Sequence, residues 1–438
     1  MKHLLSSLVF TAFILSLRQV GKLGLETGDL IVLPRAVADE KLFYPELVNK
    51  FYQLNEGRLF WTTDSLRQQL VQGIDTAFYG GLVREKYHEG ELSVERRVPE
   101  TDSIGLLASD RLFTDAAIAL SKDIYQGYRT KTWVGYDQLS PNNADTDNDF
   151  LLQGLMRIQN SDQFKLFLTS LEPSHTAYTM LKQELRKQTE KHARDTIAFL
   201  VTSMNFYRWI HHFHFEQVIV INLPAARLQY YENDSVVLQM KTVVGKPSTP
   251  SPRFATVCDQ AILYPYWYVP RSITFNEYLP KIKNDPSWLD GNNMQVIDGS
   301  GKIMDHHKMN WAAYHTGYFP YIIRQSTGCD NALGVIKFNI ITPYGVYLHD
   351  TNNKTAFLSG QRFYSHGCIR LEDPFELGNR LLAGKLDTNF LRSCFKEQKP
   401  VPVVLGEPVP VFSVYMPAMV DAGGKIRYYK DIYKLINW

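Results

Sequence analysis

The hydrophobic pattern of the chain changes its period once. In the first half, apolar residues recur every three or four positions, which is the spacing of one face of an α-helix. Such stripes occupy residues 44–52, 66–78 and 112–124, and helical patterns continue to about residue 210. The third stripe follows Ser109-Asp110, which we expect to cap its helix. These stripes predict a helical bundle with a shared apolar core.

Strand signals replace the helical pattern near residue 212. Apolar runs occupy residues 218–221 and 236–244, and Ile336, Phe338 and Ile340 alternate with polar side chains. Residues 408–411 and a Gly-Gly turn at 421–425 predict further strands and a hairpin. We therefore predict an α+β chain, with a mostly helical scaffold over residues 21–211 and a mostly-β domain over residues 212–438.

Two polar stretches interrupt these patterns. Residues 140–149, SPNNADTDND, predict a loop. Residues 273–325 are rich in Pro, Asn and Asp and only partly helical, with Trp288 and Trp311 to support a small core. Long inserts of this kind are usually functional lids or disordered segments. We predict a small subdomain inserted in the β domain.

The first twenty residues predict export. A basic start precedes an apolar run at residues 4–17, and Arg18 follows it. Fourteen apolar residues suit the core of a signal peptide and are short for a membrane span. No small-x-small cleavage site follows, so residues 1–20 are interpreted as a signal peptide or an N-terminal anchor that associates with the membrane.

Composition excludes several classes of partner and cofactor. The net charge is only +2 over 438 residues, and the basic residues are spread along the chain, so we predict no nucleic-acid partner. No Cys-x-x-Cys pair occurs, which argues against a zinc or thioredoxin-type site. The pair His306-His307 is interpreted as a surface pair, because adjacent side chains diverge and no carboxylate or cysteine completes a site. We predict no metal and no cofactor.

The four cysteines are interpreted from their contexts. Cys258, Cys329 and Cys394 are most simply buried small side chains. A disulfide between Cys258 and Cys329 is the alternative in an exported protein. Cys368 stands apart because it lies in the segment Ser-His-Gly-Cys.

That segment carries the candidate chemistry. His349 closes a predicted strand and precedes Cys368 by 19 positions. Cysteine attacks as a thiolate, and an imidazole within reach is the usual way to generate one near neutral pH. Gly367 allows the backbone to turn so that N–H groups point at whatever the sulfur attacks. The pattern predicts nucleophilic acyl chemistry.

These residues resemble the L,D-transpeptidase catalytic domain family. Ser-His-Gly-Cys-Ile-Arg after a strand-end histidine is its motif, and the likeness extends to five further segments, at residues 265–267, 269–272, 331–334, 337–338 and 346–351. The resemblance is to the larger members, which have an N-terminal helical scaffold domain and a capping subdomain, here residues 273–325. It implies an enzyme of peptidoglycan synthesis that acts on stem peptides in the periplasm.

The resemblance also implies residue roles. Cys368 would be the nucleophile and His349 its base, held by the carbonyl of Asp350. Other residues are expected to stabilise the oxyanion or support the loop: His366, Gly367 and Ser365. Arg370 would bind a substrate carboxylate or brace the loop. The remaining substrate-binding candidates are aromatic: Tyr347, Trp267 and Tyr266.

Two other functions stay open. A carboxypeptidase or amidase on the same fold would use the same residues and differ only in letting water, not an amine, attack. A non-catalytic envelope scaffold would be expected to lack the cysteine or the histidine. The sequence also departs from the larger family members, because we find no room for a peptidoglycan-binding module between the helical part and residue 203. Substrate recruitment would then depend on the cleft, the capping subdomain or the helical part.

Overall fold

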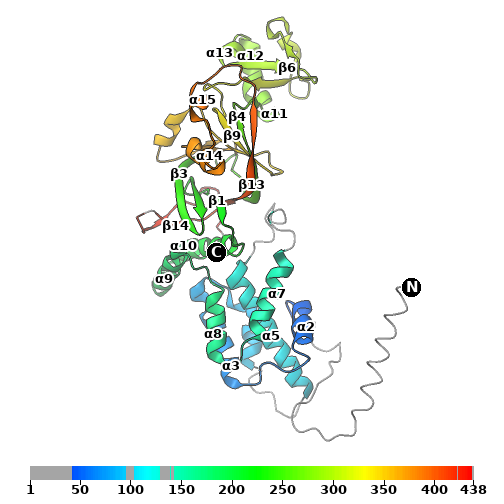
Figure 1. Cartoon of the computed structure of the whole chain (residues 1–438), viewed down its shortest axis with the longest axis vertical. Coiled ribbons are helices and arrows are strands. Elements are labelled where there is room, and N and C mark those ends of the chain that lie inside the picture. The colour runs from blue at the N-terminus through cyan, green and yellow to red at the C-terminus, as the bar shows by residue number, and fades with distance from the viewer. Residues whose placement is uncertain (1–41, 95–102, 129–138, 140–142, 422, 437–438) are drawn as a thin grey trace, which may run out of the picture.

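A computed structural model describes residues 42–94, 103–128, 139, 143–421 and 423–436. Its parts follow one another along the long axis (Figure 1): a helical lobe at one end, a β-sheet in the middle and a small subdomain at the other end. The predicted α+β class is confirmed. The predicted leader, residues 1–20, lies outside the described residues. Within the described part, no helix has the length and apolarity needed to cross a bilayer.

The helical lobe is built around helix α5 (Ser103–Gln126). Around it lie α2 (Pro45–Leu54), α3 (Asp64–Thr76), α4 (Glu89–Val94), α7 (Asn143–Met156) and α8 (Ser161–Ser170). The three predicted stripes are confirmed as buried faces of α2, α3 and α5 that share one apolar core, except that Phe78 lies in the 3₁₀ turn after α3 and packs against the neighbouring core.

Two local predictions in this lobe are wrong. Helix α5 begins at Ser103, so Ser109 and Asp110 lie inside it and cap nothing. Asp110 instead accepts the backbone N–H groups of Phe60 and Trp61. Helix α7 occupies residues 143–156, so the predicted loop is helical from residue 143 onward. Two of its acidic side chains have partners on neighbouring helices: Asp147 accepts a hydrogen bond from Gln126 at 2.9 Å, and Asp149 pairs with Lys50.

Helices α9 (Thr176–Glu190) and α10 (Arg194–His211) lie between the lobe and the sheet. Their apolar side chains share one core with the strands, as Trp209 does with Phe412 at 4.9 Å between ring centroids. Strand β1 begins at Gln217, soon after α10 ends. The change from helix to strand therefore falls between His211 and Gln217. The apolar core of the helical lobe, however, ends at Leu171, and the core shared with the sheet begins at Ala177. The domain limits given above stay a prediction.

The main sheet has nine strands in the order β11-β3-β12-β10-β9-β4-β13-β1-β2. A further pairing joins β2, the last strand in this order, to β3, the second, so eight of the strands form a closed, barrel-like sheet and β11 lies outside the ring. The strands are β1 (Gln217–Asn222), β2 (Arg227–Glu232), β3 (Ser235–Gly245), β4 (Phe254–Leu263), β9 (Ile336–Ile340), β10 (Leu348–His349), β11 (Phe363–Ser365), β12 (Ile369–Leu371) and β13 (Val401–Val414). Helices α14 (Pro374–Leu381) and α15 (Thr388–Arg392) follow β12, and the predicted tail hairpin is confirmed as β14 (Ala418–Val420) and β15 (Ile426–Tyr428).

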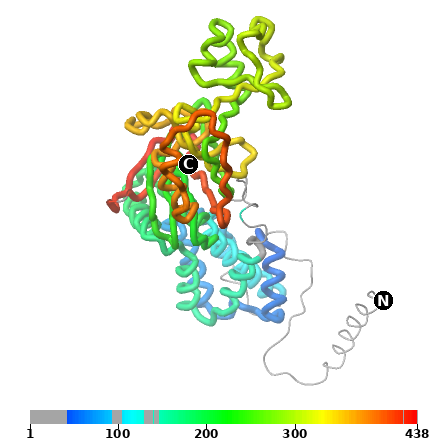
Figure 2. The backbone as a smooth tube through the Cα atoms, turned by 45° about the horizontal axis from the view of Figure 1, so that its top comes forward, coloured from blue at the N-terminus to red at the C-terminus, as the bar shows by residue number. Residues whose placement is uncertain are grey.

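A second, four-stranded sheet organises the small subdomain, residues 267–325, which we call the cap. Its order is β5-β8-β6-β7. The elements are β5 (Trp267–Tyr268), α11 (Arg271–Ile273), the π-helical turn η5 (Thr274–Tyr278), α12 (Leu279–Asn284), α13 (Trp288–Gly291), β6 (Met294–Ile297), β7 (Ile303–Met304), the 3₁₀ turns η6 (His306–Lys308) and η7 (Trp311–Ala313), and β8 (Ile322–Gln325). The cap has a core of its own that includes Leu289, Val296 and Trp311. Figure 2 shows it as a separate body beyond the main sheet.

One disulfide fastens the chain where it leaves the cap. Cys329 bonds to Cys394, with their Cα atoms 5.1 Å apart, whereas Cys258 and Cys368 are free. The alternative pairing of Cys258 with Cys329 is therefore wrong, and neither Cys329 nor Cys394 is a simple buried thiol. Nearby, Thr327 donates to the carbonyl of Gln398 at 2.8 Å, so two segments far apart in sequence are joined at this point.

Candidate active site

The loop that carries Cys368 is held by its own serine. Ser365 Oγ accepts the N–H of Gly367 at 3.1 Å and donates to the carbonyl of Cys368 at 2.6 Å. Gly367 has φ +120°, a region that side chains with a Cβ rarely adopt. Ser251 then donates to the Gly367 carbonyl at 2.7 Å. The loop is thus fixed from both sides. Because the Gly367 N–H is already engaged, the backbone N–H of Cys368 is the better placed oxyanion donor.

Strand register brings the charged residues together. His349 on β10 lies directly opposite Arg370 on β12 and opposite Lys337 on β9. Side chains that face each other across neighbouring strands point to the same side of a sheet. Cys368 precedes Arg370 by two positions, so the sulfur emerges on that side as well. One face of three adjacent strands therefore carries a thiol, an imidazole and two cations.

His349 is fixed in a single tautomer. The ring is 4% exposed, and its Nδ1 lies 2.5 Å from the carbonyl oxygen of Asp350, so Nδ1–H donates and Nε2 keeps its lone pair. Burial, with Arg370 and Lys337 adding to it, lowers the pKa of His349 to about 3, although the bond to Asp350 acts the other way. At neutral pH the imidazole is an uncharged proton acceptor.

The backbone of Asp350 is positioned by its own carboxylate. That carboxylate accepts the N–H of Val335 at 3.0 Å and pairs with Lys354. Gly334 packs against it with φ +59°, and a Cβ there would lie 2.1 Å from Oδ2. A larger residue at position 334 would displace Asp350 and with it the carbonyl that orients His349.

The Cys368 thiol is surrounded by groups that favour its ionised form. Burial raises the pKa of Cys368, while the N–H and hydroxyl of Tyr347, the Lys337 ammonium and the Arg370 guanidinium act to lower it. The net pKa stays above its ordinary value. Because the pKa of Cys368 is raised and that of His349 is lowered, the two groups rest as a thiol and a neutral imidazole, and we expect proton transfer to accompany attack.

Lys337 is a site residue that the sequence alone did not reveal. Its Nζ lies 4.1 Å from the centroid of the Tyr347 ring, which is a cation–π contact. Within the described residues, neither Lys337 nor Arg370 forms a salt bridge, and burial lowers the pKa of both groups. Two half-buried cations beside a thiol favour an anionic ligand. The sequence signal was a lysine between Ile336 and Phe338, at one of the two polar positions of an alternating strand.

The cap reaches the site in two places. Trp267 of the cap acts to lower the pKa of Tyr347, whereas Cys368 acts to raise it, so both side chains lie near the Tyr347 hydroxyl. His366 Nε2 lies 2.8 Å from Oε1 of Glu277 on η5. Trp267 thus lies near Tyr347, and His366 faces the cap. Tyr266 lies elsewhere, with the Arg324 guanidinium 4.0 Å from its ring centroid.

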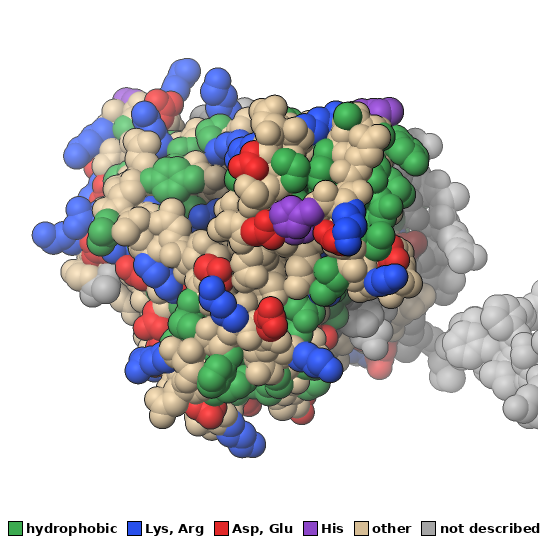
Figure 3. All heavy atoms as spheres, turned by 90° about the horizontal axis from the view of Figure 1, so that it is seen from above, with side chains coloured by type: hydrophobic (Ala, Val, Ile, Leu, Met, Phe, Trp, Pro, Cys, Tyr) green, Lys and Arg blue, Asp and Glu red, His purple; other side chains and the backbone are tan. Residues whose placement is uncertain are grey.

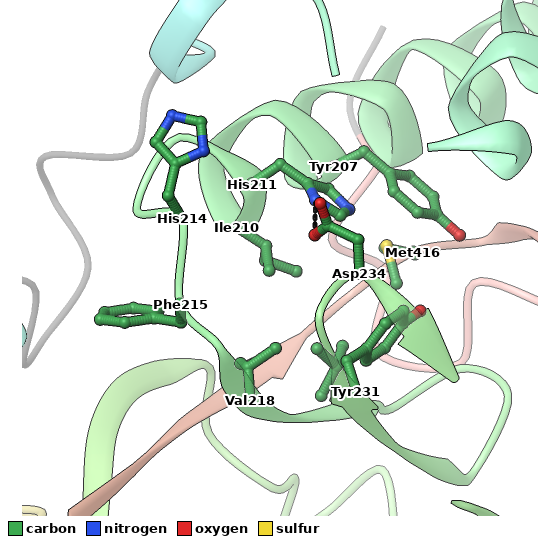
Figure 4. Close-up of a pocket in the computed structure, with 10 residues that line it drawn as sticks. Tyr207, Ile210, His211, His214, Phe215, Val218, Tyr231, Asp234 and Met416 are labelled. Carbon is green, nitrogen blue, oxygen red and sulfur yellow. Dashed lines mark hydrogen bonds and ion pairs between the residues drawn. The ribbon is translucent and has the colours of Figure 1, made fainter. Parts of the chain in front are cut away.

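A small cavity lies far from these residues in the fold. It has a volume of about 20 Å³ and lies between α10, strands β1 and β2 and the segment around Met416 (Figure 4). His211 and Asp234 pair within it at 3.1 Å. In the closed sheet β1 lies opposite β10, and β3 separates β2 from β12; the cavity contains none of the predicted site residues. It has room for about one water molecule, not a stem peptide.

The surface at the cap end has no dominant charge. Seen from that end, basic and acidic side chains are interspersed, with hydrophobic groups between them (Figure 3). This agrees with the small net charge of +2. The concentrated positive charge near Cys368 is therefore a local property of the site.

Comparison with known proteins gives matches over most of the chain. Residues 216–411 match a family model described as the L,D-transpeptidase catalytic domain, and residues 46–185 match one described as a Scaffold domain. A Haemophilus influenzae protein named as a candidate L,D-transpeptidase is 27% identical over 410 residues, which cover 92% of this chain and 81% of that protein. Helix α10 lies between the two matched segments.

Solved structures give weaker matches. An L,D-transpeptidase from Mycobacterium smegmatis is 16% identical with a TM-score of 0.22, and the match covers 45% of this chain and 58% of that one, less than two thirds of its length. The catalytic domain of an Enterococcus faecium L,D-transpeptidase acylated by ertapenem is 15% identical with a TM-score of 0.18, and the match covers 43% of this chain and 96% of that domain.

Proposed function

The chain belongs to the L,D-transpeptidase family, and we propose that it forms peptidoglycan cross-links through a cysteine acyl-enzyme. The observation that carries the proposal is the pairing of strands β10 and β12, which sets His349, with its Nε2 lone pair free, beside the strand that Cys368 leads into. A nucleophile, an oriented base and an N–H donor for the oxyanion are the parts that acyl transfer needs.

The first half-reaction is acylation. His349 Nε2 takes the proton of Cys368 as the sulfur attacks the carbonyl carbon at the L-centre of the third residue of a tetrapeptide stem. The Cys368 N–H stabilises the resulting oxyanion. When the carbon–nitrogen bond breaks, the imidazolium returns its proton to the departing amine. Terminal D-alanine leaves, and a thioester joins the stem to Cys368.

The second half-reaction restores the enzyme. The side-chain amine of an acceptor stem attacks the thioester, His349 accepts the amine proton, and the proton returns to the sulfur as the thiolate leaves. One amide bond is broken and another is formed, so no nucleotide cofactor is needed. Hydrolysis would follow the same course with water as the nucleophile. The cap, close to the site through Trp267 and Glu277, favours the amine by limiting access of water.

Recognition of the donor rests on the two cations. Lys337 and Arg370 flank His349 on the same face of the sheet, and a stem peptide offers carboxylates near the bond that reacts. Arginine binds a carboxylate through two parallel N–H bonds, and lysine contributes a point charge. We assign the terminal carboxylate of the donor to this pair.

The remaining parts have supporting roles in the proposal. Residues 21–211 act as a scaffold, residues 212–438 as the catalytic domain and residues 273–325 as its capping subdomain. Export to the periplasm agrees with the Cys329–Cys394 disulfide, because disulfides persist in oxidising compartments. Recruitment to peptidoglycan is assigned to the cleft, the capping subdomain and the scaffold.

The test is to incubate the purified protein with disaccharide-tetrapeptides and to identify products by mass spectrometry. Cross-linked dimers that disappear in Cys368→Ala would support the proposal. Tripeptides without dimers would favour the carboxypeptidase alternative, and dimers that persist in Cys368→Ala would refute the assignment. As a second probe, a carbapenem should acylate the wild-type cysteine.

A further inference from the structure

Three side chains in the cap converge on one point. Asp290 on α13 lies 3.2 Å from Nε2 of His306 through one carboxylate oxygen and 3.2 Å from Nε2 of His307 through the other. The two imidazole centroids are 4.2 Å apart, and the three donor atoms all lie within 4.8 Å of one another. The sequence argument that the adjacent histidines diverge and lack a carboxylate is therefore wrong, because the 3₁₀ turn η6 places both rings beside α13.

The spacing of these atoms suits a tetrahedral metal ion. Zinc binds imidazole nitrogen at about 2.0–2.1 Å and carboxylate oxygen at about 2.0–2.2 Å, so two ligands of one tetrahedron lie roughly 3.4 Å apart. Each imidazole nitrogen lies 3.2 Å from its own oxygen of the Asp290 carboxylate, close to that value. Two imidazoles and one carboxylate also favour zinc over magnesium or calcium, which prefer oxygen ligands alone.

One nitrogen of the cluster lacks a hydrogen bond. The His306 Nε2 is buried and makes no hydrogen bond within the described residues, although a carboxylate oxygen lies 3.2 Å away. This distance is short enough for a hydrogen bond, so it is the angle between the two groups that prevents one. A buried polar atom without a partner costs free energy, and a metal ion between the three side chains would satisfy it.

The surroundings hold the histidines in place and keep the site open. Trp311 Nε1 donates to the His306 carbonyl at 2.8 Å, and the Asp305 side chain accepts the His307 N–H at 3.2 Å. Asp305 also pairs with Lys308 at 3.0 Å, which offsets the nearest ammonium charge. The side chains of Asp290 and His307 are 53% and 58% exposed, so an ion can reach them from solvent.

We propose that Asp290, His306 and His307 form a zinc-binding site in the cap, with water as the fourth ligand. The ion would join α13, which precedes strand β6, to η6, which follows β7, and so close the β6–β7 hairpin at its open end. Its role is to stabilise the cap. The site is separate from Cys368, and the proposal does not depend on the transpeptidase reaction.

The test measures zinc binding by the full chain. All proteins carry Cys368→Ser, so that the free thiol at the active site does not take zinc, and all are stripped with a chelator before titration with zinc chloride by calorimetry. We expect one zinc ion per chain. His307→Ala and Asp290→Asn should each weaken binding by about ten-fold or more, because the first removes a ligand and the second removes the negative charge of one. His315→Ala, at another exposed cap histidine, should bind like the parent.

X-ray absorption at the zinc edge gives a readout that needs no variant. The proposal predicts imidazole nitrogen and carboxylate oxygen ligands at about 2.0–2.1 Å. Circular dichroism confirms that the variants fold. The absence of saturable binding, affinity that is the same in His307→Ala and Asp290→Asn as in the parent, or a sulfur-containing ligand shell would overturn the proposal.

Discussion

His366 Nε2 lies 2.8 Å from Oε1 of Glu277 and so links the catalytic loop to the cap. Gly367 and Cys368 follow this histidine directly, and Glu277 belongs to the π-helical turn η5. The side chain that the motif places beside the nucleophile therefore faces the cap. We infer that the contact helps to keep the cap over the thioester while an acceptor amine enters.

Glu277→Gln should raise the ratio of hydrolysed tripeptide to cross-linked dimer. Both side chains are partly exposed, and pairs of this kind are weak, so we expect a change of roughly two- to five-fold. Carbapenem acylation should be nearly unaffected, because the first step does not require that water be excluded. The measurement is product analysis by mass spectrometry, with the exposed Glu407→Gln as control. An unchanged ratio would show that the contact has no part in partitioning.

Lys337→Met should weaken donor binding. A charge-assisted bond to a carboxylate is worth about 1.5–3 kcal/mol, and because Lys337 is partly exposed we expect the lower end, an increase of about ten-fold in KM. The decisive comparison uses a donor that ends in an amide in place of the terminal carboxylate. Wild type and Lys337→Met should then differ little, while the exposed Lys385→Met should behave as wild type with both donors. If Lys337→Met raised KM equally for both donors, Lys337 would act on the Cys368 thiol and not on the donor carboxylate.

The rate constant for acylation by a carbapenem should not fall near pH 6.5, where an ordinary histidine gains its proton. His349 acts in its uncharged form, and because its pKa is lowered to about 3, it stays uncharged as the pH falls through 6.5. The rate constant should therefore be flat from pH 7 to pH 5. A midpoint near 6.5 would contradict the burial and cation contacts of His349.

Stability must be followed in the same pH range. Burial lowers the pKa of His349 to about 3 and of His175 and His212 to about 4. Below pH 6.5 the unfolded chain binds protons that the folded chain excludes, so these groups make the folded state less stable as pH falls towards 4. Circular dichroism at each pH separates this loss from a change in the reaction.

Removal of the disulfide should lower the melting temperature. The bond closes a loop between residues 65 positions apart, and the chain-entropy relation gives about 4 kcal/mol for such a loop. Cys329→Ser/Cys394→Ser should melt below wild type, and a reducing agent should lower the melting of wild type but not of the double variant. Thiol mapping that found Cys329 and Cys394 free, with Cys258 oxidised, would contradict the pairing.

The sequence predicted the site residues that belong to one short motif, and it did not predict those that other strands bring to the site. Cys368 and His349 lie in a short motif whose spacing identifies a thiol and a base. Lys337 was interpreted as a polar position of an alternating strand and as part of the resembling segment 337–338, and no role in the site was assigned to it. Its role arises from register, which places it opposite His349 on β10, and register is not visible in a single strand.

Contacts between distant segments explain the other differences. Nothing in the spacing of the cysteines distinguishes Cys394 from Cys258 as the partner of Cys329, because the pairing depends on how the segment after α15 folds back beneath the cap. Residues 143–149 resemble a loop, yet they form the start of α7, where neighbouring helices supply partners for Asp147 and Asp149, as Gln126 does for Asp147. In the same way, the carboxylate near His306 and His307 is that of Asp290, which belongs to a separate helix, α13.

The most direct test of the account traps the acyl-enzyme. Wild-type protein is incubated with a disaccharide-tetrapeptide whose side-chain amine is acetylated, so that no acceptor is present, and its intact mass is measured. We predict an adduct equal to the donor minus D-alanine, mapped to Cys368 by peptide analysis and absent from Cys368→Ala. An adduct on another residue, or release of D-alanine by Cys368→Ala at the wild-type rate, would contradict the account.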